Sequence, residues 1–341
     1  MKQFDYLREA TLEGTLEAAR GRPRSREGHG ADARFIAGGT NLTDYMALGV
    51  MRPDVLVDVN ELQERLGGID SNKERLRLGA LVRMAEAEDH PVIAREYPVI
   101  RQTLLLAASR QIRNMASLGG NVLQRTRCEY FREISWPCNK RRPGAGCAAM
   151  EGINRQHAIL GTSPQCIAAY PGDFAQALIA LEATVETVGG PSGPRSFPFA
   201  QLHRLPGDTP HIETSLAPGE LITGYNVPAG PWTRRSCYLK IRDRDSYQFA
   251  LTSAAVALEL EGERVKEVRI ALGGVATVPW RAREAEAVLK GNNLDEALAT
   301  RAAAAAFAEA QPREHNAYKV KIGQETLVRA LLQAQQMKVL Q

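Results

Sequence analysis

Four of the five cysteines lie close together near the middle of the chain. They follow the spacing C-x9-C-x8-C-x18-C from Cys128 through Cys138 and Cys147 to Cys166. Four thiolates match the ligand count of a four-iron, four-sulfur cluster, although the spacing differs from the ferredoxin patterns. Structural zinc usually needs a close C-x2-4-C pair, which is missing, and two disulfides would require an oxidising compartment. The residues alone leave cluster, disulfides and unrelated thiols open, with the cluster favoured.

The remaining cysteine and the charges near the other four allow further expectations. Cys237 stands in an apolar segment and is expected to be a buried core thiol. Basic residues gather around the four clustered cysteines, either as a solvated face or as cations that stabilise an anionic centre. His157 is a further candidate ligand, although a lone histidine in a polar loop is expected at the surface. The basic residues are Arg125, Arg127, Arg132, Lys140, Arg141 and Arg142.

A glycine-rich turn, IAGGTNLTD, occupies residues 36–44, where a short apolar strand meets a helix. Without a Cβ, Gly38 and Gly39 let the backbone approach a bound anion, and the N–H groups and the Thr and Asn side chains are suited to a pyrophosphate. A tight turn with a capping Thr or Asn is the alternative. The third glycine of a G-x-G-x-x-G fingerprint is missing, while Asp58 keeps an NAD interpretation open as a ribose-binding acid.

A second turn rich in small residues follows in residues 108–122, ASRQIRNMASLGGNV. An apolar helix ends there, and Gly119, Gly120 and Asn121 form another turn. Two such turns, both rich in hydrogen-bond donors, are suited to clamp a long ligand from two sides. The alternative is an ordinary helix C-cap followed by a turn.

The periodicity of apolar residues predicts the elements that must hold these turns. The first turn falls within a small βαβ unit, preceded by a polar stretch at 21–32 that is expected to be a mobile loop. Its expected strands are 3–7, 33–37 and 54–59, and its helices are 11–20 and 45–48.

Regular patterns continue beyond this unit, with one long interruption. RLRLGALV at 75–82 predicts a hairpin, and helical patterns follow, but residues 124–170 show no periodicity. An irregular stretch of this length is usually functional. After a boundary near 233–236, strands, a long hairpin turning at 261–263 and three helices predict a C-terminal α/β domain.

Composition excludes several classes of protein. The chain has 341 residues, of which 44% are hydrophobic and 24% charged, so two or three globular domains are expected. A net charge of +4 is too small to predict nucleic-acid binding. No segment approaches the roughly 20 apolar residues of a membrane helix, so membrane insertion is not expected. The N-terminus lacks a secretory pattern, so no export signal is expected in this chain.

Three motifs, IAGGTNL, QIRNMASLGGNV and KIRDRDSYQFAL, resemble in this order the FAD-binding medium subunits of the molybdenum hydroxylases, the xanthine dehydrogenase and aldehyde oxidoreductase group. The cysteine segment resembles the inserted loop of flavin subunits with an extra [4Fe-4S] cluster, as in periplasmic-type aldehyde oxidoreductases and 4-hydroxybenzoyl-CoA reductase. The resemblance implies an α+β fold of the PCMH type. Its parts would be a βαβ FAD-binding subdomain (1–60), a larger α+β subdomain (61–232) with the iron–sulfur loop (124–170), and a C-terminal α/β domain of the CO dehydrogenase flavoprotein type (233–341).

The same resemblance implies the site residues. The first turn would surround the FAD pyrophosphate, the second would complete the clamp, Asp173 would bind the flavin nucleotide, and Lys240 and Tyr247 would lie near the isoalloxazine. Tyr247 has an alternative role as a strand aromatic packed in the C-terminal domain. The implied FAD residues are Ile36, Ala37, Gly38, Gly39, Thr40, Asn41, Leu42, Thr43, Asp44, Ser117, Gly120, Asn121, Asp173, Lys240 and Tyr247. The implied [4Fe-4S] ligands are Cys128, Cys138, Cys147 and Cys166.

The function implied by the resemblance is electron transfer, with no catalytic residue in this chain. An aldehyde would be oxidised to an acid at a molybdenum cofactor on a large partner subunit. Electrons would pass through [2Fe-2S] clusters of a small partner subunit to FAD and an external acceptor, within a heterotrimer or its dimer. The alternatives are a related subunit for xanthine-like or aromatic acyl-CoA substrates, a stand-alone NAD or flavin dehydrogenase, and a scaffold. The compartment would be the cytoplasm, or the periplasm if a partner carries a twin-arginine signal.

Overall fold

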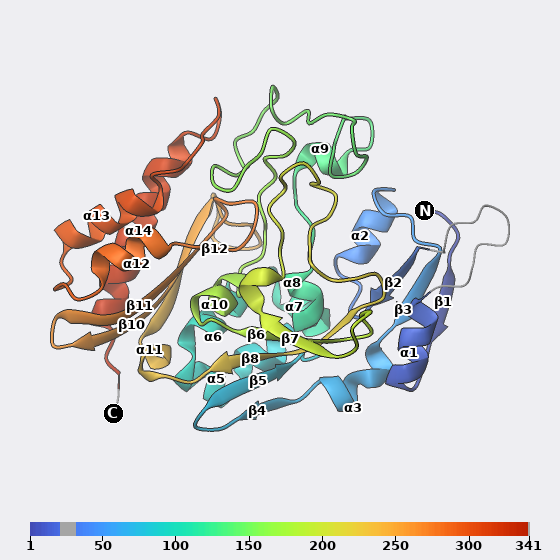
Figure 1. Cartoon of the computed structure of the whole chain (residues 1–341), viewed down its shortest axis with the longest axis horizontal. Helices are drawn as coiled ribbons and strands as arrows, with labels where there is room; N and C mark the ends of the chain where they lie inside the picture. Colours follow the sequence, from blue (N-terminus) through green and yellow to red (C-terminus); the bar gives the residue numbers. More distant parts are fainter. Residues whose placement is uncertain (21–31, 340–341) are drawn as a thin grey trace.

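The computed structural model describes residues 1–20 and 32–339 and contains three β-sheets (Figure 1). The expected loop at 21–32 lies outside the described residues except for its last position. In Figure 1 the small N-terminal sheet lies at the right, the five-stranded sheet at the bottom and the C-terminal unit at the left. The irregular segment 124–170, called the cysteine loop below, lies at the top.

The N-terminal sheet confirms the predicted βαβ unit. Its strand order is β1-β3-β2, and both pairings are parallel, as crossover helices require. All four residues of the central strand are buried. The helix after the glycine turn begins at Leu42, three residues earlier than expected. The elements are β1 (Asp5–Arg8), α1 (Leu12–Ala19), β2 (Ala33–Ile36), α2 (Leu42–Ala47) and β3 (Val55–Asp58).

The middle sheet is antiparallel throughout, with the order β4-β5-β8-β6-β7. A hairpin was expected within RLRLGALV, but this segment supplies only the second strand, and the first strand lies before it. Asn72 accepts hydrogen bonds from the N–H groups of Glu74 and Arg75 at 2.9 Å each, so the chain turns before the segment. The strands are β4 (Ile69–Ser71), β5 (Arg75–Gly79), β6 (Thr184–Val188), β7 (Arg195–Pro198) and β8 (Leu221–Pro228).

Short helices connect this sheet to the rest of the chain. In the cysteine loop the single α-helix is α9, which agrees with the predicted lack of periodicity. The α-helices of this region are α3 (Gln63–Leu66), α4 (Met84–Asp89), α5 (Pro91–Glu96), α6 (Pro98–Leu105), α7 (Arg110–Met115), α8 (Leu118–Val122), α9 (Glu129–Arg132), α10 (Phe174–Ala180) and α11 (Pro231–Arg234).

The C-terminal sheet has the order β12-β11-β10-β9. The long hairpin is confirmed, since Glu261 pairs with Arg264 at its turn. The expected α/β domain is an antiparallel sheet followed by three helices, because hairpins rather than crossover helices join its strands. The elements are β9 (Ser236–Ile241), β10 (Thr252–Glu261), β11 (Arg264–Gly273), β12 (Trp280–Arg281), α12 (Arg283–Leu289), α13 (Glu296–Ala306) and α14 (Tyr318–Gln336).

Both faces of the C-terminal sheet are covered. Helices α12 and α14 contact one face, while α6 and α10 of the middle region contact the other. Strand β10 shows the alternation that this requires: Val256 belongs to the apolar cluster under α14, and Ala255 belongs to the cluster under α10. The C-terminal unit therefore shares a core with the middle region. No helix among the described residues is long and apolar enough to cross a bilayer.

Candidate functional site

The two glycine-containing turns lie against each other. A Cβ on Gly38 would come within 1.9 Å of the Met115 carbonyl oxygen, so only glycine allows this approach of the two backbones. Gly39 has φ of +70°, a conformation that glycine adopts without strain. The structure thus brings the predicted halves of the clamp together. It also gives Gly38 a role that the sequence did not indicate, which is packing against the second turn.

Each turn presents an asparagine with an unused amide atom. Asn41 stands at the N-cap position of α2 but makes no capping bond, and its buried Nδ2 has no hydrogen-bond partner in the described structure. The buried Oδ1 of Asn121 likewise has none. Ser117 caps α8 by accepting a hydrogen bond from the Gly120 N–H at 3.2 Å, so the second turn is the start of a helix rather than a C-cap. A buried polar atom without a hydrogen-bond partner destabilises the fold. A polar ligand bound between the turns would give hydrogen-bond partners to Asn41 Nδ2 and Asn121 Oδ1.

Asp44 faces the cysteine loop. Its carboxylate accepts hydrogen bonds from Arg127 at 2.8 Å and from Arg132 at 2.6 Å, and these pairs hold the pKa of Asp44 below its usual value, Arg132 most strongly. The neighbouring Tyr45 is fully buried and donates to the backbone carbonyl of Arg125 at 3.0 Å. Helix α2 is therefore attached to the cysteine loop, and the Asp44 carboxylate is occupied by two arginines.

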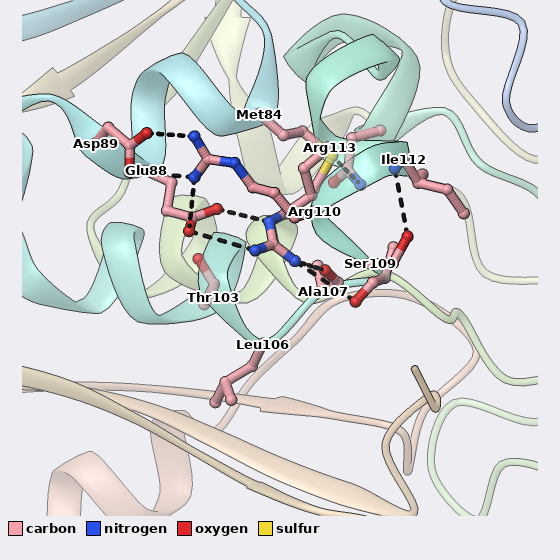
Figure 2. A network of polar contacts seen from close by, with 12 residues as sticks. Met84, Glu88, Asp89, Thr103, Leu106, Ala107, Ser109, Arg110, Ile112 and Arg113 are labelled. Atoms are coloured by element: carbon pink, nitrogen blue, oxygen red, sulfur yellow. Dashed lines mark hydrogen bonds and ion pairs between the residues drawn. The ribbon is translucent and has the colours of Figure 1, made fainter. Parts of the chain in front are cut away.

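A buried ion pair positions the second turn (Figure 2). The Arg113 guanidinium donates to Glu88 of α4 at 2.6 Å, and these side chains are 7% and 4% exposed. Arg113 also donates to the Ala107 carbonyl at 2.8 Å, which holds the chain where Ala108 has φ of +46°. Arg110 adds bonds to Glu88 and Asp89 at the rim. The sequence did not indicate this pair, because Arg113 stands in a polar stretch, next to Asn114 and three residues after Arg110, where a surface arginine is the ordinary expectation.

Asp173 and Lys240, predicted from different motifs, form one buried pair. Lys240 Nζ lies 2.7 Å from Asp173 and also donates to the Leu106 carbonyl at 3.0 Å. Tyr238 donates to the same carboxylate, and burial, with the nearby Asp173, raises the pKa of Tyr238 well above its ordinary value. The loop 106–109 is thus held by Arg113 on one side and by Lys240 of the C-terminal sheet on the other. The contact between Asp173 and Lys240 was not predicted from the sequence.

A larger cavity lies between the cysteine loop and the C-terminal sheet. It measures about 840 Å³ with its open mouth included. Tyr247 does not line it. Tyr247 is 55% exposed with φ of +52° in the loop between β9 and β10, so its alternative role as a packed strand aromatic is wrong. The lining includes Thr126, Arg127, Cys128, Arg155, His157, Tyr170, Gly172, Phe249 and Gly274.

The four clustered cysteines line one smaller cavity. Cys138 and Cys147 are paired across a β-bridge, and Cys166 closes another with Ser163. All four are free thiols, so the disulfide alternative is not supported. Burial raises the pKa of Cys128 to about 12 and that of Cys166 to about 11. Such thiols are protonated and unreactive by themselves, and a bound cationic centre would be needed to make them thiolates.

Side chains, rather than regular secondary structure, hold the cysteines. Arg141 donates to the carbonyl oxygens of Tyr130 at 2.9 Å and Phe131 at 2.8 Å, which shapes the chain between the first two cysteines. Asn139 donates to the Gln165 carbonyl at 3.1 Å and accepts from the Gly146 N–H at 2.8 Å. Residues far apart in the loop are thereby fixed around one cavity.

The four cysteines line one cavity, but they do not form a ready-made site for a single ion. No three His, Cys, Asp or Glu side chains of the described residues are placed to hold a metal ion. A single ion requires donors within about 2.3 Å of one point, whereas a four-iron cluster binds each thiolate through a separate iron. Four sulfur atoms around a shared cavity fit the second case.

Two expectations about this loop need correction. His157 is 5% exposed rather than at the surface, because it packs inside the loop with its Nε2 3.2 Å from the Cys128 sulfur. Burial lowers its pKa to about 4. The basic residues are not simply a solvated face, since four of them pair with two acids outside the loop. Arg127 and Arg132 pair with Asp44, and Arg125 and Lys140 pair with Glu213. Cys237, as expected, is fully buried.

Comparisons with known proteins identify the family of this chain. Residues 2–230 match the family described as FAD binding domain in molybdopterin dehydrogenase, and residues 237–334 match the CO dehydrogenase flavoprotein C-terminal domain. The aldehyde oxidoreductase FAD-binding subunit PaoB of Escherichia coli K12 is 43% identical over 98% of this chain and 99% of its own length. The carbon monoxide dehydrogenase medium chain of Afipia carboxidovorans is 29% identical over 89% and 90%.

A solved structure supports the fold independently. The quinoline 2-oxidoreductase of Pseudomonas putida 86 superposes with a TM-score of 0.74 at 24% identity and covers 98% of this chain and 99% of its own. At that identity the match concerns the fold alone.

Proposed function

Because the chain belongs to the family of FAD-binding medium subunits of the molybdenum hydroxylases, we propose that it carries FAD and a [4Fe-4S] cluster in a molybdenum-dependent aldehyde oxidoreductase. The 43% identity to PaoB over nearly the full length supports the aldehyde as substrate class. The observation that carries the cluster is the convergence of Cys128, Cys138, Cys147 and Cys166 on one cavity.

In this proposal the FAD pyrophosphate lies between the two turns. The unsatisfied Nδ2 of Asn41 would donate a hydrogen bond to a pyrophosphate oxygen, and the unsatisfied Oδ1 of Asn121 would accept one from a water that bridges it to the pyrophosphate. The residues that line the larger cavity, among them Gly172 and Phe249, would hold the flavin ring. FAD supplies the capacity to take up two electrons and to release them singly or in pairs.

The protein's own residues position and insulate this group. The buried Asp173–Lys240 pair ties the chain next to Gly172, a lining residue of the larger cavity, to the C-terminal sheet. Tyr170, buried and bonded to the Val122 carbonyl at 3.0 Å, excludes water from the end of the cavity next to the second turn. No residue here needs to exchange a proton with an aldehyde, because that chemistry belongs to the large partner subunit.

The partners follow from the same family. A large molybdenum-cofactor subunit would oxidise the aldehyde, and a small subunit with [2Fe-2S] clusters would pass electrons to this chain and an external acceptor. Export of the assembly to the periplasm by a partner's twin-arginine signal is part of the proposal.

The test uses the assembled complex. Flavin and iron are counted per chain, and spectra are recorded anaerobically for the wild type and for Cys→Ser variants at the four positions. We expect one FAD, four irons above those of the partners, and loss of these four irons in each variant with FAD retained. A wild type without the extra iron, or with stoichiometric zinc, contradicts the cluster. Failure of the complex to oxidise any aldehyde contradicts the substrate class.

A further inference from the structure

His157 lies between the two cavities. Its Nε2 is 3.2 Å from the Cys128 sulfur, and its side chain lines the larger cavity. Cys128 lines both cavities, whereas Cys138, Cys147 and Cys166 line the smaller one and not the larger. The Cys128–His157 contact is therefore the point where the proposed cluster site adjoins the proposed flavin site.

The backbone that carries His157 is held by the C-terminal unit. Side chains near the start of α14 bind four consecutive carbonyl oxygens, those of residues 155–158. Tyr318 and Lys319 donate to the first two at 3.0 Å each, and Asn316 donates to the last two at 3.4 and 3.2 Å. Lys319 is fully buried and also binds the Gly274 carbonyl at 2.8 Å. Residues 155–158 form no helix or strand, but these hydrogen bonds fix their carbonyl groups. They thereby also fix the position of the His157 imidazole.

The ring itself has one described polar contact. Nδ1 of His157 is buried without a hydrogen-bond partner in the described structure, and the Tyr130 ring lies 6.1 Å away between centroids. A cysteine thiolate bound to iron has no hydrogen to donate, so the ring nitrogen that faces it must carry the N–H. We propose that His157 donates this N–H to the Cys128 thiolate and raises the reduction potential of the cluster at its flavin-facing ligand. This inference rests on the proposed function, since it requires the cluster.

The direction follows from electrostatics. Reduction adds one electron to the cluster and increases the negative charge on its sulfur atoms, so a hydrogen bond to a ligand sulfur stabilises the reduced state more than the oxidised one. The N–H bond stays intact and no proton is transferred. His157 is a positioning and tuning residue in this scheme. The four cysteines already complete the ligand count, so it is not a ligand.

Two substitutions separate the hydrogen bond from packing. In His157→Gln the amide nitrogen takes the place of Nε2 and the donor is kept, whereas His157→Leu fills similar space without a donor. The midpoint potential of the cluster is measured in the complex by redox titration with electron paramagnetic resonance. We expect His157→Leu to disfavour reduction about tenfold, which is about 59 mV for one electron, and His157→Gln to stay much closer to the wild type. Equal potentials in all three proteins overturn the inference.

A matched control is available in the same chain. His203 also uses Nε2 in a hydrogen bond, to the Val122 carbonyl at 2.9 Å, and also leaves Nδ1 unsatisfied in the described structure. Its partner is a carbonyl instead of a thiol. His203→Gln and His203→Leu should therefore leave the cluster potential unchanged. A shift as large as that of His157→Leu would show a general effect of burying leucine, and would overturn the specific role of His157.

A spectroscopic measurement covers the case in which His157→Leu loses the cluster. Wild-type complex with ¹⁵N-labelled histidine is reduced, and nitrogen couplings are measured by pulsed electron paramagnetic resonance. A weak histidine coupling that is absent in His157→Gln supports the hydrogen bond. A coupling of the size of a direct iron–nitrogen bond, or none, overturns it. Absence of the four extra irons from the wild type itself would instead refute the proposed function.

Discussion

The cysteine loop and the C-terminal sheet both contain buried cysteines, but they hold them differently. In the sheet, Cys237 lies on β9 inside an apolar cluster, and ladder hydrogen bonds fix the backbone. In the loop, side chains such as Arg141 and Asn139 bind the backbone carbonyls in place of a ladder. The first arrangement gives an inert thiol in a tightly packed core. The second leaves four thiols facing a common space, because no neighbouring strand or helix fills it.

The difference teaches that a thiol's role is set by what surrounds it. Burial raises the pKa of Cys237 to about 12, the same value as for Cys128. Burial by itself therefore does not distinguish a structural cysteine from a candidate ligand. The distinction is that Cys128 shares its cavity with three other sulfurs, whereas Cys237 contacts the Ala330 carbonyl of α14.

The largest expected effect is a loss of stability in the C-terminal sheet. Leu272 of β11 is fully buried in the C-terminal apolar cluster, so Leu272→Ala should lower the free energy of unfolding by about 3 kcal/mol. Urea unfolding followed by circular dichroism measures this change. Iron and FAD per folded chain should stay unchanged, and Leu205→Ala, at a position 54% exposed, is the control. Loss of iron from folded Leu272→Ala would show that the two regions are not separable.

The next effect concerns Lys319, which joins the sheet to the loop. Burial, with a smaller contribution from Arg155, lowers the pKa of Lys319 from its usual value of 10.5 to about 7. Between pH 7 and 10.5 the unfolded chain therefore binds more protons at this residue, and folding is favoured as the pH rises. The stability of the wild type relative to Lys319→Met should increase by about 2 kcal/mol from pH 7 to pH 9.

Urea unfolding of both proteins at the two pH values measures this difference, because the titration of all shared groups cancels. The control is Lys266→Met, whose ammonium is on the surface and pairs with Glu259. A pH-independent difference between the wild type and Lys319→Met would mean that Lys319 keeps an ordinary pKa in the fold.

A smaller effect is expected in the cysteine loop alone. Asp44→Asn removes the charge that faces Arg127 and Arg132, and these partly exposed pairs contribute about 1 kcal/mol. We expect faster trypsin cleavage after these two arginines, with little change in global unfolding. Asp243→Asn is the matched control, because Asp243 forms a similar pair with Arg155 at 2.8 Å. Equal cleavage rates in the two variants would exclude a specific attachment of the loop through Asp44.

The smallest expected effect tests the comparison directly. Cys237→Ala removes one sulfur from a packed core and should cost about 1 kcal/mol, with all iron retained. Cys138→Ala should instead remove the four extra irons. Both variants are compared by iron analysis and by the midpoint of urea unfolding. The distinction between the two regions fails if the two variants lose the same amount of iron.

Much of the fold followed from local patterns. Alternation of apolar residues predicted the βαβ unit and the long hairpin, since each strand must bury one face or both. The absence of periodicity at 124–170 correctly indicated a loop without extended secondary structure. The position of the hairpin formed by β4 and β5 was not predicted. Its turn is stabilised by the Asn72 side chain, which accepts a backbone hydrogen bond, and the spacing of apolar residues contains no sign of this.

The sequence by itself determined the residue types at the site: two donor-rich turns, four clustered thiols, Asp173 and Lys240. Tertiary structure alone decided which of them meet. In the folded chain Gly38 packs against Met115, and the Asp44 carboxylate pairs with two arginines. His157 lies against Cys128. These contacts join segments that are far apart in the chain, such as Glu88 with Arg113 and Lys319 with Gln156. Their energy depends on burial and on the geometry of both partners, which no local pattern contains.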